Sequence, residues 1–248
     1  MKNHLKSRIV STAVVAVVGL FVATSANAAL VTWEPSWSLV TDNTAIKTLA
    51  GFTTYGGVNF NGSNTTISNG TTNVDFTGIA QNSSGATAGI TVSNTGFGFQ
   101  STATNNSTVV SAVGAPQTWA TVLDRVIGDF DNSASISLSG LTVGSSYYVQ
   151  FFSSAPDANI LTNSLITSGG IVSPAFGGHT SGLTRSIVGS FTADGTIQSF
   201  TVTGTEPTYS ALVVGVRPAT AAATIPEPAS IALVSLASAC LLRRRRLA

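Results

Sequence analysis

A single histidine limits the nucleophilic chemistry that the body of this chain could perform. Outside the first 28 residues the sequence contains only His179, which follows two glycines and precedes a threonine. A serine nucleophile needs a base beside it, so any such site would have to include this residue. The chain has no Gly-x-Ser-x-Gly turn of the kind that presents a nucleophilic serine. We therefore interpret His179 as a loop residue and predict no catalytic residue and no enzymatic activity.

Three aspartates are the best candidates for acid chemistry: Asp124, Asp129 and Asp131. Two carboxylates about 5 to 9.5 Å apart would suit glycoside hydrolysis, so a secreted hydrolase is one alternative. Asp129, Asp131 and Ser133 also alternate like the first ligands of a calcium loop, but alanine and glycine occupy the sixth and twelfth positions of that loop. We interpret the segment as a turn before a strand. No metal site or other cofactor is predicted, and a structural calcium held by several loops stays as an alternative.

Aromatic residues offer flat apolar faces on which a sugar ring could stack: Trp33, Trp37, Trp119, Tyr147 and Tyr148. Most aromatic side chains of a β-sandwich lie in its core. We expect Trp37 and Tyr148 to be the exposed members and the contacts for carbohydrate. A carbohydrate-binding module with a defined pocket is therefore the main alternative for this chain's function.

Composition excludes several other classes of function. Only four of the 11 lysine and arginine residues lie between residues 29 and 224, against nine of the ten acidic residues, which gives that part a formal charge of −5. Without a basic face, binding to nucleic acid is not expected. The only cysteine, Cys240, lies near the C-terminus, so the fold must form without a disulfide bond.

The first 28 residues have the pattern of a secretory signal peptide. Basic residues precede an apolar run over residues 10–23, and Ala26 and Ala28 form the small-residue pattern that a signal peptidase accepts before Ala29. The apolar run is short for a membrane-spanning helix, which needs about 20 residues. We predict an N-terminal signal helix, cleavage between Ala28 and Ala29, and export.

A second targeting segment lies at the C-terminus. Pro226, Glu227 and Pro228 precede an apolar run over residues 231–242, which is expected to form a short hydrophobic helix. Four consecutive arginines follow and would stop transfer on the cytoplasmic side: Arg243, Arg244, Arg245 and Arg246. A plain membrane tail anchor is the alternative interpretation of this pattern.

The order of these three parts resembles the PEP-CTERM sorting signal. That resemblance implies transient insertion in the inner membrane, recognition by an exosortase, and cleavage near the Pro-Glu-Pro motif. It also implies release or attachment at the cell surface and an association with exopolysaccharide. The resemblance thus implies an exosortase and extracellular polysaccharide as partners, in addition to the signal peptidase that the N-terminal pattern predicts.

Between the two ends, runs with a period of two residues predict strands. Residues 134–139 alternate apolar and polar side chains, and residues 147–152 carry large, mostly apolar side chains on both faces, as expected of a central strand. Asp194 and Gly195 predict a hairpin between the runs that flank them. Residues 211–216 form the last predicted strand, and residues 118–123 predict one short helix that covers an end of the domain.

We therefore divide the chain into a signal peptide (1–28), a β domain (29–218), a linker (219–224) and a sorting tail (225–248). Residues 31–33, 140–144 and 189–195 resemble segments of the jelly-roll domains that often precede PEP-CTERM tails. The resemblance implies an all-β, two-sheet antiparallel sandwich of the galactose-binding-like kind, and it implies no ligand. The predicted function is that of a non-enzymatic cell-surface or matrix protein associated with exopolysaccharide.

Overall fold

The computed structural model describes residues 28–102, 119, 122–129, 133–154, 163–176 and 184–219. The predicted signal helix up to residue 27, the linker beyond Ala219, the sorting tail, His179 and Asp131 lie outside these residues. Within the described part of the chain, no helix is long and apolar enough to cross a membrane.

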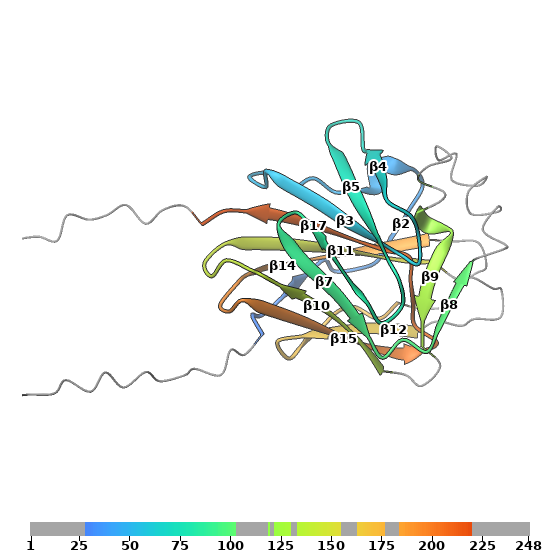
Figure 1. Cartoon of the computed structure of the whole chain (residues 1–248). Coiled ribbons are helices and arrows are strands. Elements are labelled where there is room, and N and C mark those ends of the chain that lie inside the picture. Colours follow the sequence, from blue (N-terminus) through green and yellow to red (C-terminus); the bar gives the residue numbers. More distant parts are fainter. Residues whose placement is uncertain are drawn as a thin grey trace, which may run out of the picture.

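Most described residues belong to two large sheets (Figure 1). In order, the 8-stranded sheet contains β1 (Thr32–Trp33), β14 (Thr184–Thr192), β11 (Ser146–Ser154), β17 (Ala211–Arg217), β3 (Thr54–Phe60), β5 (Asn73–Ile79) and β4 (Thr65–Ser68), and β2 (Ser38–Leu39) also pairs with β14. The 6-stranded sheet contains β13 (Ile171–Val172), β12 (Asn163–Ser168), β15 (Ile197–Thr205), β10 (Ser133–Ser139), β7 (Ile90–Thr95) and β6 (Ser84–Thr87).

A smaller sheet of β16 (Thr208–Tyr209), β9 (Arg125–Gly128) and β8 (Phe99–Thr102) lies at one end of the two large ones (Figure 1). A short 3-10 helix, η1, covers Asn43–Ala45. Among the described strands, β3 and β5 pair in parallel, and every other pair is antiparallel. The prediction of an all-β, two-sheet antiparallel sandwich is confirmed.

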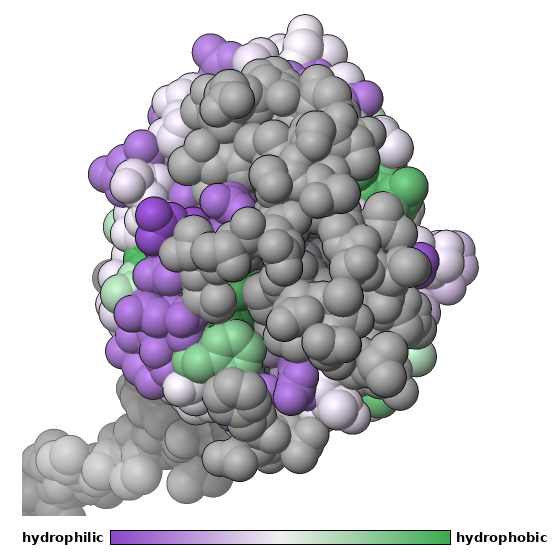
Figure 2. Space-filling model, turned by 90° about the vertical axis from the view of Figure 1, so that its right-hand side faces the viewer, coloured by the Kyte–Doolittle hydropathy of each residue, from purple (hydrophilic) through white to green (hydrophobic). Residues whose placement is uncertain are grey.

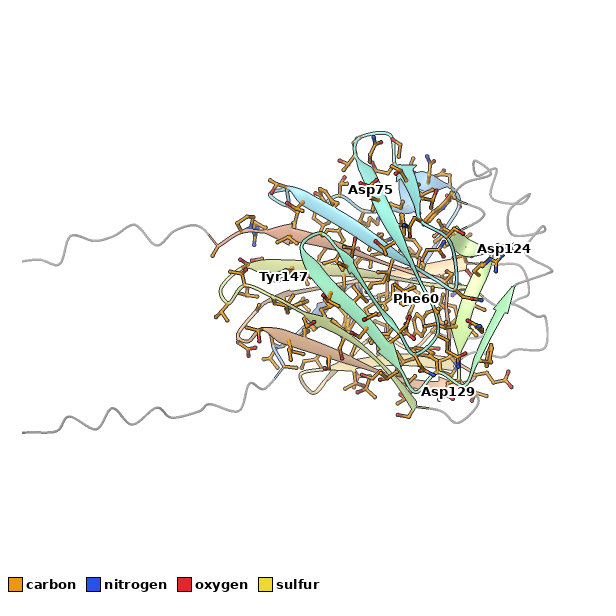
Figure 3. The ribbon with its side chains drawn as sticks, in the orientation of Figure 1. Phe60, Asp75, Asp124, Asp129 and Tyr147 are labelled. Atoms are coloured by element: carbon orange, nitrogen blue, oxygen red, sulfur yellow. The ribbon has the colours of Figure 1, made fainter. Side chains whose placement is uncertain are left out.

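The main core lies between the two large sheets, with Phe60 near its middle (Figure 3). The rings of Phe151 on β11 and Phe200 on β15 meet edge to face, with their centroids 5.3 Å apart. On β10 the buried residues alternate with half-buried serines, and Ile136 and Leu138 are both fully buried. The predicted faces of this strand are confirmed.

A second apolar cluster covers the outer face of the 8-stranded sheet. On β11, Val149 and Phe151 face the main core, whereas Tyr148 and Phe152 face this outer cluster. The prediction that residues 147–152 form a central strand is therefore confirmed. Of the predicted short helix, the described residues are helical and buried: Trp119, Val122 and Leu123. The Trp119 ring contacts Phe152 at 5.2 Å, so this segment covers the outer face of the sheet.

The hairpin predicted at Asp194 and Gly195 is wrong. The preceding strand, β14, pairs with β11 and β1, whereas the following strand, β15, pairs with β10 and β12 in the other sheet. The turn reverses the chain, but it carries the chain across the sandwich. Both strands point apolar residues at the same core, and burying those two faces against each other requires opposite sheets.

Two buried glutamines tie chain segments onto the sheets through their side chains. On the outer face of β11, Gln150 Oε1 accepts a hydrogen bond from the Lys47 amide (2.9 Å), and its Nε2 donates to the Ala45 carbonyl (2.7 Å) and to Ser186 Oγ (3.0 Å). The carboxamide thus bonds to a passing backbone as a neighbouring strand would. Gln198, on the core face of β15, makes an equivalent set of bonds to Ala29 and Ser168.

Candidate functional site

Trp37, predicted to contact carbohydrate, is buried. Its side chain is only 9% exposed, its Nε1 donates a hydrogen bond to the Pro174 carbonyl at 3.0 Å, and its ring meets Phe176 edge to face at 4.7 Å. The indole closes the gap between an edge of one sheet and the segment that follows β13. The expectation that this ring is exposed is wrong, because its polar atom finds a backbone partner inside the fold.

Tyr148, the other predicted contact, is fully buried. Its hydroxyl donates to the Lys47 carbonyl, and the rings of Phe52 and Tyr55 lie 5.2 Å and 6.1 Å from its own. Burial raises the pKa of this hydroxyl above the ordinary value for tyrosine, and the nearby Tyr55 adds to the effect. The expectation of exposure is wrong here too, because the segment before β3 folds over the ring.

The other three aromatic candidates belong to the cores. Trp119 and Tyr147 are buried, and Trp33 is half-buried between Phe151 and Phe200. The Tyr147 ring stacks on Phe191 at 5.5 Å. Four of the five rings of the predicted set are therefore buried, and only Trp33 keeps part of its side chain exposed.

The described acidic candidates do not form a pair across a cleft. Figure 3 places Asp124 and Asp129 at opposite ends of β9. Asp129 is 2% exposed, and its Oδ2 accepts a hydrogen bond at 2.9 Å from the amide of Ser133, the first residue of β10. Burial raises the pKa of Asp124, and the positive charge of Arg125 partly offsets this.

Within the described residues, no three His, Cys, Asp or Glu side chains come close enough to hold a metal ion. His179 and Asp131 lie outside the described residues, and the alternative of a structural calcium stays a prediction.

A groove of about 660 Å³ lies at one end of the 8-stranded sheet. The described chain begins and ends at this same end of the molecule (Figure 1). Hydroxyl groups line the groove in cross-strand pairs: Thr32 stands opposite Ser190, and Ser146 stands opposite Thr192. We call this feature the terminal groove.

Arg217 and Asp194 bring charge to the terminal groove. Arg217 is exposed, its Nη2 donates to Ser146 Oγ at 3.0 Å, and its guanidinium carbon lies 5.2 Å from the centre of the Phe52 ring. These two contacts orient a planar donor group beside the hydroxyls. Asp194 is exposed and offers two acceptor oxygens. The arrangement can form hydrogen bonds to a hydroxylated or acidic ligand, and it contains no base beside a nucleophile.

The opposite end of the molecule is shown in Figure 2. Among the described residues visible there, hydrophilic side chains gather on one side and hydrophobic ones form small separate patches.

Sequence reasoning missed the terminal groove. Arg217 is one of the four basic residues between residues 29 and 224, and no role follows from its sequence position, whereas Asp194 predicts only a turn. The signal that the sequence offers for this groove is a polar residue at the end of each strand run. Because such residues also occur at ordinary strand ends, this signal does not identify a binding site.

Residues 224–246 match the PEP-CTERM protein-sorting motif. The expected sorting signal is thus confirmed, and it supports export to the cell surface or the extracellular space. No curated protein is detectably similar in sequence to this chain.

Among solved structures, the chain is similar to the ANX2 ectodomain from Arabidopsis thaliana, with 12% identity and a TM-score of 0.44, covering 66% of this chain and 52% of that one. It is also similar to the ANXUR1 extracellular domain from the same plant, with 10% identity and a TM-score of 0.45, covering 65% of this chain and 48% of that one. The chain thus spans about half the length of these proteins.

Proposed function

We propose that this chain is an exported protein of the cell surface or extracellular matrix, processed at its tail by an exosortase, without catalytic activity and associated with exopolysaccharide. The sorting motif at residues 224–246 is the observation that carries the proposal. It begins shortly after Ala219, whose amide donates a hydrogen bond to Ser145 Oγ at 3.1 Å. The described sandwich is complete before the motif begins, so removal of the tail would leave every described strand in place.

The character of the domain supports an association with polysaccharide. Its weak net charge and its many serine, threonine and asparagine side chains favour contact with a hydrated polymer through hydrogen bonds. Such bonds replace bonds to water, so each contributes only about 1 kcal/mol. With both expected carbohydrate contacts, Trp37 and Tyr148, buried, we expect weak contacts repeated along a polymer.

A carbohydrate-binding module with a defined pocket is the second candidate, and the terminal groove favours it. Asp194 could accept hydrogen bonds from neighbouring sugar hydroxyls while Arg217 and the serine and threonine hydroxyls donate. A secreted hydrolase receives less support, because Asp129 bonds to the Ser133 amide and Asp124 lies at the other end of β9.

The first test is the intact mass and cell fraction of the protein in its native host, with and without the exosortase. The expected product begins at Ala29, and it ends near Pro226 only when the exosortase is present. A membrane-held product that keeps Arg243 to Arg246 in both strains would refute exosortase processing and make the chain a tail-anchored protein.

A further inference from the structure

The residue that follows the predicted signal cleavage is built into the core. Ala29 is 5% exposed, although it is the second described residue of the chain. Its amide donates a hydrogen bond to Gln198 Oε1 at 2.9 Å, and its carbonyl accepts one from Gln198 Nε2 at 2.8 Å. Both backbone polar groups of the first residue of the predicted mature chain are therefore bonded to Gln198.

Gln198 occupies a position where an apolar side chain would be expected. It lies on the core face of β15 together with Phe200 and Val202, stands opposite Leu138 on β10, and is 1% exposed. Its second amide hydrogen is used as well, because Nε2 also donates to Ser168 Oγ at 2.7 Å. A buried carboxamide costs free energy unless its atoms are bonded, and here the bonds go to Ser168 and to the backbone of Ala29.

Gly169 completes the site from the other side. Its φ is +57°, and a Cβ atom at this position would lie 2.6 Å from the carbonyl oxygens of both Ala28 and Ala29. Any larger residue would push the chain away from Gln198. Gln198, Ser168 and Gly169 thus form a small buried site around the backbone of Ala29, and we call it the Ala29 site.

We propose that the ligand of the Ala29 site is the α-ammonium group that signal peptidase creates on Ala29. The inference rests on the proposed export with cleavage between Ala28 and Ala29. Hydrolysis breaks the C–N bond between these residues: water supplies the oxygen of the Ala28 carboxylate, and its two hydrogens protonate the Ala29 nitrogen to give the ammonium. The nitrogen keeps a hydrogen directed at Gln198 Oε1, and its positive charge strengthens that bond.

The experiment compares two full-length precursors, expressed in an exporting host and purified after processing. One is the natural sequence, and the other carries a Gly-Ser dipeptide between Ala28 and Ala29. Intact mass establishes where each product begins. The readout is the rate at which an N-hydroxysuccinimide ester acylates the N-terminal amine, measured by peptide mass.

In the natural product the amine is bonded to Gln198, whereas the inserted dipeptide carries its amine beyond the site. We expect acylation of the natural N-terminus to be about tenfold slower than that of the extended one. Gln198→Met should remove this protection. The matched control is Gln150→Met, which disrupts an equally buried carboxamide bonded to Ala45 and Lys47 and should leave the protection intact.

Equal acylation rates for the natural and extended N-termini would overturn the proposal, and that comparison needs no change at Gln198. A folded Gln198→Met protein with full protection would overturn it as well. A product that begins at another residue would refute it together with the predicted cleavage site. None of these outcomes bears on the sorting tail, because its processing is judged from the C-terminal end of the product.

Discussion

Replacing Gln150 by methionine should lower the stability of the protein, because this side chain holds the backbone at Ala45 and Lys47 against the outer face of the 8-stranded sheet. The side chain is fully buried, and its three bonds hold the backbone at Ala45 and Lys47 and the hydroxyl of Ser186. Methionine has a similar length, so the change removes the hydrogen bonds and leaves the volume nearly filled.

The magnitude follows from the groups left without partners. The Lys47 amide and the Ala45 carbonyl, which belong to half-buried residues, lose their bonds, and each backbone group left without a partner costs about 1–3 kcal/mol. The Ser186 hydroxyl can rotate to another acceptor and adds little. Burying the thioether returns about 1 kcal/mol. We expect the free energy of unfolding to fall by about 3 kcal/mol, which for a domain of this size lowers Tm by about 6–12 °C.

Thermal and urea unfolding of the processed protein measure this loss. Gln100→Met is the matched control, because Gln100 is exposed on β8 and the same substitution there should change stability by less than about 0.5 kcal/mol. If the two variants were equally stable, the side-chain bonds of Gln150 would contribute nothing measurable, and the reasoning from unsatisfied groups would be refuted.

Further predictions concern the terminal groove, Tyr148 and a close glycine contact. Arg217→Ala should weaken retention on the host's polysaccharide about tenfold. Arg185→Ala is the control, because it also removes a cation from over a phenylalanine ring but should leave retention unchanged. Equal retention of the two variants would exclude the terminal groove as the polysaccharide-binding site. Because burial raises the pKa of Tyr148, its neutral form stabilises the fold below about pH 10, and this contribution is lost as pH rises above that value. Tyr148→Phe should therefore lower stability by about 1 kcal/mol at pH 8 and reduce the further loss between about pH 10 and 12; an unchanged alkaline slope in urea titrations would contradict this. Gly215→Ala should cost about 1–3 kcal/mol, because a Cβ there would lie 2.0 Å from the Tyr148 ring, and a wild-type urea midpoint would show that the ring moves freely.

The sequence was sufficient for features that depend on local alternation. The alternating serines of β10 and the large, mostly apolar side chains on both faces of β11 each specify which residues a sheet must bury, whatever its neighbours are. The sorting motif was also legible, because its chemistry depends on the order of residues along the chain. These predictions needed no knowledge of which strand lies beside which.

Strand partners and exposure depend on residues far apart in the sequence, and there the predictions failed. Asp194 and Gly195 specify a chain reversal, but whether β14 and β15 pair depends on the faces that β10 and β11 offer them. Trp37 and Tyr148 become buried because Pro174 and Lys47 supply carbonyl acceptors 137 and 101 residues away. The terminal groove has the same origin, since Thr32 and Arg217 line one groove only because both ends of the domain join the same sheet.

Gln150 shows how a further inference could have been made from sequence. In the run from Tyr147 to Phe152 it shares a face with Tyr148 and Phe152, and that face was predicted to be covered. A carboxamide on a covered face must bond all its polar atoms, and the strand's own backbone is already engaged in the sheet. The partners therefore had to come from a passing segment outside the sheet, which is where Ala45 and Lys47 lie. The same argument applied to Gln198, between Ile197 and Phe200, would have predicted a docked chain segment there, although it could not have identified Ala29 as that segment.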